Sequence, residues 1–315
     1  MTPQPSFAAR TGLPPEVAVR EVGPRDGLQV EAPMAPESRV ALIEAVLAAG
    51  VTRVEAVSFV SPKAVPAMAH PEEVLAAVPW PPGVTVTALV PNRRGAELAL
   101  ETDVGELTVT IAASPTYNQR NVGMTIEESL DAVRDICDLA GARGVPVDAV
   151  ISCAFGSPYK GDIDPAAVAG LADQLLERGA AAITLADTTG MATPRVVADV
   201  LDETGPAVGL HVHETRGTGL VNCYAALQSG VRRFDTSLGG LGGSPFAHGA
   251  AGNVATEELV ALLDDLGVAT GIDLAGLIEA SRLLEELIGR AVPSRVAHAG
   301  PRWPPLPDRS APSSG

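Results

Sequence analysis

The chain has 315 residues, of which 46% are hydrophobic but only 3% aromatic, so a core would be built mainly from Ala, Val, Leu and Ile. Its formal net charge of −16 argues against binding to nucleic acid or to an anionic membrane, because both attract basic surfaces. The three cysteines, Cys137, Cys153 and Cys223, are an odd number, which predicts no disulfide framework and a reducing, cytoplasmic location. The first residues lack the pattern of a signal peptide, and no run of apolar residues is long enough to predict a membrane span.

Short β-branched apolar runs alternate along the chain with longer segments of helical period. We expect strands at residues 17–22, 53–59, 84–90, 106–112, 146–153, 182–186, 208–213 and 232–238. We expect helices between them at 37–49, 72–78, 127–140, 165–178, 193–203 and 219–228, and two more after the last strand at 257–266 and 273–288. Strands that alternate with helices form a parallel sheet, and eight of them over about 220 residues fit an α/β TIM (β/α)8 barrel. A doubly wound open sheet is the alternative, although it would normally carry a glycine-rich nucleotide turn after the first strand, unlike residues 23–27 (GPRDG).

Several helix starts carry clear capping patterns. Thr125 with Glu128 is typical of a capping box. Asp164 and Thr193 each precede a proline, and proline suits the first position of a helix. We expect an N-terminal arm at residues 1–16, a single barrel domain with extra C-terminal helices at 17–300, and a disordered tail rich in Pro and Ser at 301–315.

Polar side chains gather at the carboxyl ends of the expected strands, where TIM barrels place their active sites. The candidate site residues are Arg25 and Asp26 after the first strand, Glu55 on the second, Asp187 after the sixth, His211 and His213 at the end of the seventh, and Ser244 and Asn253 after the eighth. Such residues at five strand ends are difficult to produce by chance. The sequence therefore predicts one site at this end of the barrel.

His211 and His213 are the strongest indication of a metal. Two residues apart on a strand, they point to the same face, and imidazole is the commonest protein ligand of a divalent metal. A carboxylate and an amide oxygen would complete a mixed site that suits Mg²⁺ or Mn²⁺, with Zn²⁺ less favoured. Taken alone, the two histidines could be a half-buried strand pair, and Arg25 with Asp26 could be an ion pair at a turn.

Glu55 and Asp187 have two possible roles. Each could act directly as an acid or a base, or could orient Arg25 and the histidines through hydrogen bonds, and we favour the orienting role. The glycine-rich segment at 239–252 is either a flexible connector or a lid that closes over a substrate and excludes water.

The chain resembles the 3-hydroxy-3-methylglutaryl-CoA (HMG-CoA) lyases, which belong to the TIM-barrel, metal-dependent acyl-CoA lyases and synthases. The matching segments are residues 21–29 (EVGPRDGLQ), 58–63 (SFVSPK), 152–156 (SCAFG), 187–190 (DTTG), 211–213 (HVH) and 249–257 (GAAGNVATE). The similarity runs from about residue 21 to residue 300. The SFVSPK segment points to the lyases rather than the synthases.

The resemblance implies a divalent metal bound by Asp26, His211, His213 and Asn253, together with a small-molecule acyl-CoA substrate and a homodimer. It also implies that Arg25 polarises the thioester carbonyl and stabilises the enolate formed on cleavage, and Asp26 could double as the base. The reaction would be a retro-Claisen cleavage of HMG-CoA, or of a close 3-hydroxy-3-alkylglutaryl-CoA, to acetyl-CoA and a 3-keto acid such as acetoacetate. Arg25 suits this role, because a guanidinium stays charged and offers several donors to an oxyanion.

The chain departs from the family pattern in the glycine-rich segment. The family carries a cysteine there that is thought to take part in proton transfer, and this chain has Ser244. A thiol has a pKa near roughly 8.5, whereas a serine hydroxyl is a far weaker acid. His248, where many relatives have lysine, is a candidate for the missing acid, and a solvated loop histidine is the alternative.

Two other functions stay open on this evidence. One is a related acyl-CoA lyase or aldolase that acts on a different substrate and uses Ser244 natively. The other is a catalytically weak protein that binds a metal and acyl-CoA. A complete set of metal ligands beside Arg25 argues against the second.

Overall fold

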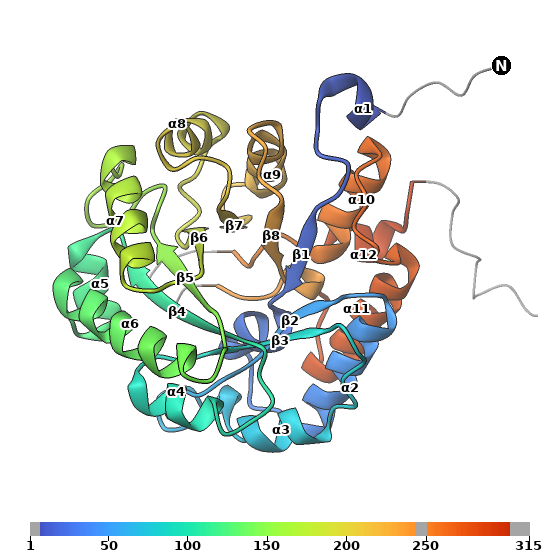
Figure 1. Ribbon diagram of the computed structural model, residues 1–315. Helices are drawn as coiled ribbons and strands as arrows, with labels where there is room; N and C mark the ends of the chain where they lie inside the picture. The colour runs from blue at the N-terminus through green and yellow to red at the C-terminus, as the bar shows by residue number, and fades with distance from the viewer. Residues whose placement is uncertain (1–6, 244–250, 303–315) are drawn as a thin grey trace, which may run out of the picture.

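The computed structural model describes residues 7–243 and 251–302, and its centre is a closed parallel barrel (Figure 1). The strands are β1 (Ala18–Glu21), β2 (Arg53–Ser58), β3 (Thr85–Leu89), β4 (Glu106–Ala112), β5 (Val147–Ser152), β6 (Ala182–Asp187), β7 (Gly209–Val212) and β8 (Arg233–Thr236). Each pairs with the next, and β8 closes on β1. The predicted TIM barrel is confirmed, every strand begins and ends within two residues of its expected bounds, and the open-sheet alternative is excluded.

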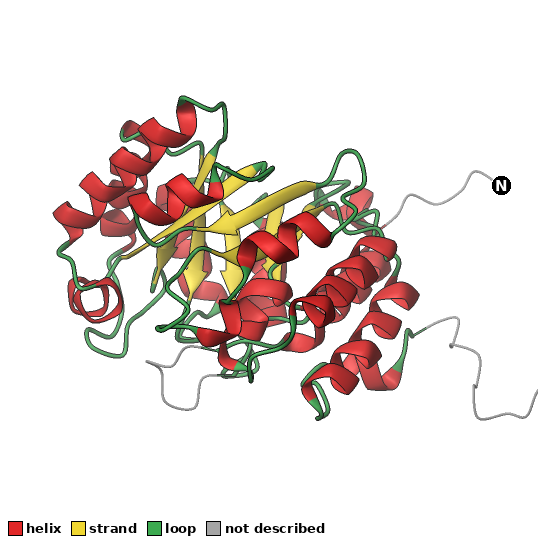
Figure 2. Ribbon diagram, turned by 90° about the horizontal axis from the view of Figure 1, so that it is seen from below, coloured by secondary structure: helices red, strands yellow, loops and turns green. Residues whose placement is uncertain are grey.

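Helices surround the barrel on its outside (Figures 1 and 2). Those predicted from the sequence are α2 (Pro36–Ala48), α3 (Pro71–Ala77), α6 (Ile126–Gly141), α7 (Pro165–Glu177), α8 (Pro194–Thr204), α9 (Gly219–Gln228), α10 (Thr256–Leu266) and α11 (Leu274–Ile288). Four short helices were not predicted from the sequence: α1 (Phe7–Thr11), α4 (Arg93–Ala99), α5 (Pro115–Val122) and α12 (Arg295–Ala299). The extra C-terminal helices cover the side of the barrel next to β1, where α11 packs against α2.

The predicted caps are present. Thr125 accepts a hydrogen bond from the Glu128 backbone while the Glu128 side chain accepts one from the Thr125 backbone, which completes the capping box of α6. The Asp164 and Thr193 side chains accept hydrogen bonds from the first turns of α7 and α8. Local sequence therefore sets where these helices begin.

The expected chain ends are only partly described. The N-terminal arm is attached to the barrel by backbone hydrogen bonds between residues 15–17 and Ala269. Residues 303–315 of the expected disordered tail lie outside the described residues. Within the described chain all three cysteines are free and buried. A bilayer-spanning segment would need a longer and more apolar helix than any found in residues 7–243 and 251–302.

The barrel register places polar side chains in a row across three neighbouring strands. Arg20 on β1 is paired with Asp235 on β8, and Asp235 is paired with His211 on β7. Paired residues on adjacent strands lie side by side and point to the same face of the sheet. The same register therefore brings a charged group from each of β1 and β8 next to the first histidine of the candidate metal site.

Candidate metal centre

Arg25 and Asp26 lie on a single tight helical turn, Gly23–Gly27, which follows β1 directly. The carbonyl oxygen of Val22 accepts hydrogen bonds from the backbone amides of residues 25, 26 and 27. A Cβ at Gly27 would lie 2.6 Å from the Ser237 Oγ, and one at Gly23 would lie 2.5 Å from a carboxylate oxygen of Glu21. The glycines therefore let this turn pack closely against the end of β8, and this contact fixes the position of Asp26.

Asp26, His211 and His213 lie close enough together to hold one metal ion, with ligand atoms all within 4.8 Å of one another. The two histidine Nε2 atoms are 3.3 Å apart, and His211 Nε2 is 4.0 Å from Asp26 Oδ2. Nitrogens at this spacing fit a single ion bound about 2.1 Å from each. All three side chains are buried.

The hydrogen bonds of the two imidazoles determine which nitrogen faces the centre. His213 Nδ1 lies 3.1 Å from the carbonyl oxygen of Ala251, and His211 Nδ1 lies 3.3 Å from Asp235 Oδ2. Both partners are acceptors, so each Nδ1 carries a proton and each Nε2 faces the centre of the site. A metal ion at this centre would be bound by the Nε2 lone pairs of the two neutral imidazoles.

Asn253 contributes a second observation that fits a metal. Its amide nitrogen donates to Asp26 Oδ2 at 2.7 Å and to the Leu241 carbonyl at 3.0 Å. Its Oδ1 is buried and has no hydrogen-bond partner in the described chain. A buried amide oxygen without a partner is costly, whereas an oxygen ligand of a divalent ion is satisfied. The carboxylate, the two imidazoles and this amide oxygen therefore form a donor set that fits a divalent metal.

The charges of the site keep Asp26 and His213 in the form that metals bind. Burial raises the pKa of Asp26, but Arg25 and the two histidines outweigh it and hold that pKa below its usual value. Burial and the positive charge of His211 lower the pKa of His213 to about 4. Asp26 is therefore a carboxylate and His213 a neutral imidazole at neutral pH.

Arg25 is buried beside the metal ligands and held by two carboxylates. Its Nε donates to Glu55 at 2.5 Å and its Nη2 also contacts Glu55, while Nη1 donates to Asp26 Oδ1 at 2.7 Å. Gln29, which was not among the predicted site residues, donates to the same Asp26 oxygen at 3.0 Å and accepts from Arg25 Nη1 at 3.5 Å. Burial raises the pKa of Glu55 more than Arg25 lowers it. The structure thus places Glu55 where it orients the guanidinium.

Asp187 is buried at the end of β6 and bonds to its own loop. One oxygen accepts from the backbone amides of Met191 and Ala192, and the other is buried with no partner in the described chain. Burial raises the pKa of Asp187 to about 7. No hydrogen bond between Asp187 and Arg25 or a histidine is present in residues 7–243 and 251–302, so the orienting hydrogen bond expected from Asp187 is absent there.

The carboxylate that does bond to a histidine is Asp235, which was not among the predicted site residues. It lies on β8 (RFDT) and is buried. A charge inside a buried strand is costly unless it is paired, and this was the available signal. Ser244 and His248, the two candidates for proton transfer, lie outside the described residues.

Comparisons with known proteins identify the family of the chain. The HMGL-like family matches residues 16–284. The 3-hydroxy-3-isohexenylglutaryl-CoA/hydroxy-methylglutaryl-CoA lyase of Pseudomonas aeruginosa is 42% identical over 91% of this chain and 98% of its own. The (R)-citramalyl-CoA lyase of Chloroflexus aurantiacus is 43% identical over 91% of this chain and 96% of its own.

A solved structure of a relative has the same fold as this chain. The HMG-CoA lyase of Acinetobacter baumannii, in complex with coenzyme A and 3-methylmalate, superposes with a TM-score of 0.87 at 40% identity, and the match covers 93% of this chain and 98% of that one. The family match and these relatives each extend over most of the chain, including every described residue of the candidate metal centre. The chain therefore belongs to the HMGL-like family.

Proposed function

We propose that this protein is a carbon–carbon lyase that cleaves HMG-CoA, or a close 3-hydroxy-3-alkylglutaryl-CoA, to acetyl-CoA and a 3-keto acid such as acetoacetate. The observation that carries the proposal is the cluster of Asp26, His211 and His213, with the unpartnered oxygen of Asn253, directly beside Arg25. The names of the relatives and the coenzyme A bound to one of them support an acyl-CoA substrate.

Asp26, His211, His213 and Asn253 would hold the metal, which we propose is Mg²⁺ or Mn²⁺ because two of the four donors are oxygens. When bound, such an ion orients substrate oxygens and makes a coordinated hydroxyl more acidic. The low pKa of Asp26 suits a ligand better than a general base, whose pKa is best near the working pH.

Arg25 would stabilise the negative charge that develops on the thioester oxygen. Glu55 accepts from its Nε and Nη2, and Asp26 and Gln29 accept from its Nη1, which fixes the plane of the guanidinium and leaves one Nη2 hydrogen for the substrate. A donor held rigidly before the reaction stabilises charge without reorganisation. Burial of Arg25 and Glu55 strengthens that effect because water is excluded.

The direct test is incubation of the purified protein and Mg²⁺ or Mn²⁺ with HMG-CoA, followed by mass spectrometry of the products. We expect acetyl-CoA and acetoacetate in equal amounts, and a large loss of both with Arg25→Met. Running Ser244→Cys in parallel tests whether the family cysteine is needed here. Absence of cleavage by both wild type and Ser244→Cys would refute the proposal.

A second substrate is favoured by the relative that is named an (R)-citramalyl-CoA lyase. The same cleavage of that compound gives acetyl-CoA and pyruvate, so one assay distinguishes the two by the keto acid released. Binding of both CoA esters without turnover would instead support a catalytically weak binding protein. From the resemblance we also propose a homodimer, which light scattering would test. From the three cysteines, which predict a reducing compartment, we propose a cytoplasmic location, which cell fractionation would test.

A further inference from the structure

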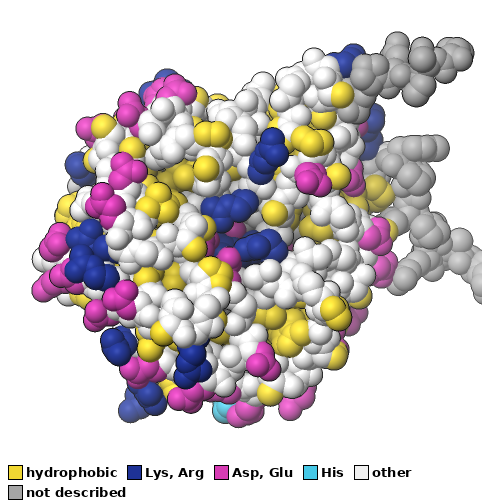
Figure 3. Space-filling view, in the orientation of Figure 1, with side chains coloured by type: hydrophobic (Ala, Val, Ile, Leu, Met, Phe, Trp, Pro, Cys, Tyr) yellow, Lys and Arg dark blue, Asp and Glu magenta, His cyan; other side chains and the backbone are white. Residues whose placement is uncertain are grey.

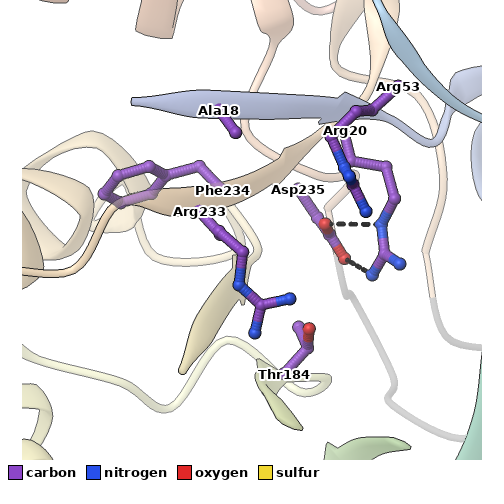
Figure 4. A pocket seen from close by; sticks show the side chains of 7 residues that line it. All are labelled: Ala18, Arg20, Arg53, Thr184, Arg233, Phe234 and Asp235. Carbon is purple, nitrogen blue, oxygen red and sulfur yellow. Dashed lines mark hydrogen bonds and ion pairs between the residues drawn. The ribbon is translucent and has the colours of Figure 1, made fainter. Parts of the chain in front are cut away.

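Arg20, Asp235 and His211 form a continuous chain of contacts from β1 across β8 to β7. Arg20 donates from Nε to Asp235 Oδ1 at 2.8 Å and from Nη2 to Asp235 Oδ2 at 2.7 Å. Figure 4 shows the guanidinium of Arg20 facing both oxygens of this carboxylate. Asp235 Oδ2 also lies 3.3 Å from His211 Nδ1. A two-pronged pair of this kind fixes the carboxylate in one orientation.

The guanidinium itself has little freedom to move. Its Nη1 lies 2.9 Å from Asp148 Oδ2 and 3.2 Å from Glu106 Oε1, so all three guanidinium nitrogens are held by carboxylates. The cavity next to Arg20, between the starts of β1, β2 and β8, is about 10 Å³, which is room for at most one water. Figure 3 shows basic and acidic side chains gathered around the centre of the face that it displays. The cavity is therefore too small for a ligand, and the cluster fixes Arg20 in place.

We propose that Arg20 and Asp235 are positioning residues that set the metal affinity of the site through His211. As the carboxylate partner of Arg20, Asp235 is an acceptor only, so His211 Nδ1 must donate to it, and this keeps His211 Nε2 directed at Asp26 and His213. Partners that orient a histidine ligand in this way change metal affinity by about 10- to 100-fold when they are altered. The inference rests on the proposed function only in that it takes the site to bind a divalent metal.

The alternative is that this ion pair only fills the barrel and stabilises the fold. Both possibilities predict a less stable variant, but only positioning predicts weaker metal binding by a folded one. Arg20→Lys keeps the charge and loses the two-pronged contact with Asp235. Arg53→Lys is the matched control, because Arg53 donates to Glu106 in the same cluster without contacting Asp235.

The experiment is titration of each purified, folded protein with Mn²⁺ alone, following free Mn²⁺ by electron paramagnetic resonance. We expect the Kd for Mn²⁺ to rise about tenfold or more in Arg20→Lys and to stay at the wild-type value in Arg53→Lys. Asp235→Asn preserves the shape of the side chain and should weaken binding by a similar factor, and it decides the matter if Arg20→Lys does not fold. Wild-type affinity in the folded variants would overturn the inference, whatever their stability.

Failure of this inference and failure of the proposed function give different results. A wild-type protein that binds Mn²⁺ but cleaves no acyl-CoA refutes the function and leaves the titration valid. Cleavage by the wild type, with equal Mn²⁺ affinity in the wild type, Arg20→Lys and Asp235→Asn, refutes the inference alone. A wild-type protein that binds no Mn²⁺ overturns both.

Discussion

Glu21 at the end of β1 is a fully buried carboxylate whose ionisation should lower the stability of the fold. It accepts hydrogen bonds from the backbone amides of Gly23 and Leu238, at 2.7 and 2.8 Å, and from the Thr256 hydroxyl at 2.5 Å. Burial nevertheless dominates and raises its pKa to about 7 from 4.5. Glutamine at this position keeps the same shape and can keep these contacts, because its amide oxygen accepts from both backbone amides.

Whether stability rises or falls with pH depends on which chain, folded or unfolded, loses the Glu21 proton at the lower pH. Below pH 4.5 the Glu21 carboxyl is protonated in the folded and the unfolded chain alike. Between pH 4.5 and about 7 only the unfolded chain ionises, so stability falls across this range and is constant above it. At about 1.4 kcal/mol for each pH unit, the loss is about 3 kcal/mol. Glu21→Gln cannot ionise and should not show this part of the loss.

The assay is urea unfolding of the wild type and Glu21→Gln at pH 4.5 and pH 8, in the presence of a chelator. We expect Glu21→Gln to gain about 3 kcal/mol relative to the wild type between the two pH values. Glu286→Gln, at an exposed position on α11, controls for the loss of one charge. Equal pH dependence in the wild type and Glu21→Gln would refute the argument that burial dominates at Glu21.

Three further predictions concern the site. Gly252→Ala places a Cβ 1.9 Å from the Gly240 carbonyl oxygen. It should therefore displace Asn253 and lower the free energy of unfolding by about 1–3 kcal/mol or more. An unchanged midpoint of urea unfolding would contradict the close packing of Gly252 against Gly240. Arg25→Met should lower kcat about 10²- to 10³-fold while Mn²⁺ binding persists, and equal losses in kcat and in Mn²⁺ affinity would show that Arg25 acts on the metal site instead. Mn²⁺ at about 100 times its Kd should raise the free energy of unfolding of the wild type by about 3 kcal/mol, measured by urea unfolding. It should stabilise His213→Ala much less. Equal stabilisation of the two proteins would show that the metal binds elsewhere.

Sequence patterns predicted the barrel because each strand is a short β-branched run between helices with clear periodicity. The helices that were missed lack that periodicity. In α5, the residues after Pro115 are mostly polar, and its start is marked by Ser114, whose side chain accepts a hydrogen bond from the backbone of Tyr117, and by Pro115 itself. The short helix α4 contains Gly95, which disfavours a helix, so Asn92 is its only clear signal.

The candidate site was partly predictable for a similar reason. Asp26, His211 and His213 lie at strand ends, where the fold places active sites, so their convergence followed from the barrel. The pairing of Arg20 with Asp235 depends on the closure of β8 onto β1, which joins residues 215 positions apart. No local pattern carries that register, so the charge of Asp235 indicates that it needs a partner but does not identify Arg20.

The central claim is that the metal held by Asp26, His211, His213 and Asn253 is required for acyl-CoA cleavage. The most direct measurement removes metal with a chelator, restores Mn²⁺ stepwise, and records bound Mn²⁺ and acetyl-CoA release from HMG-CoA on the same samples. We predict no release without metal, and a rate that rises in proportion to bound Mn²⁺ until one ion is bound per chain. Full activity in the chelated protein, or one bound Mn²⁺ per chain without cleavage, would contradict the claim.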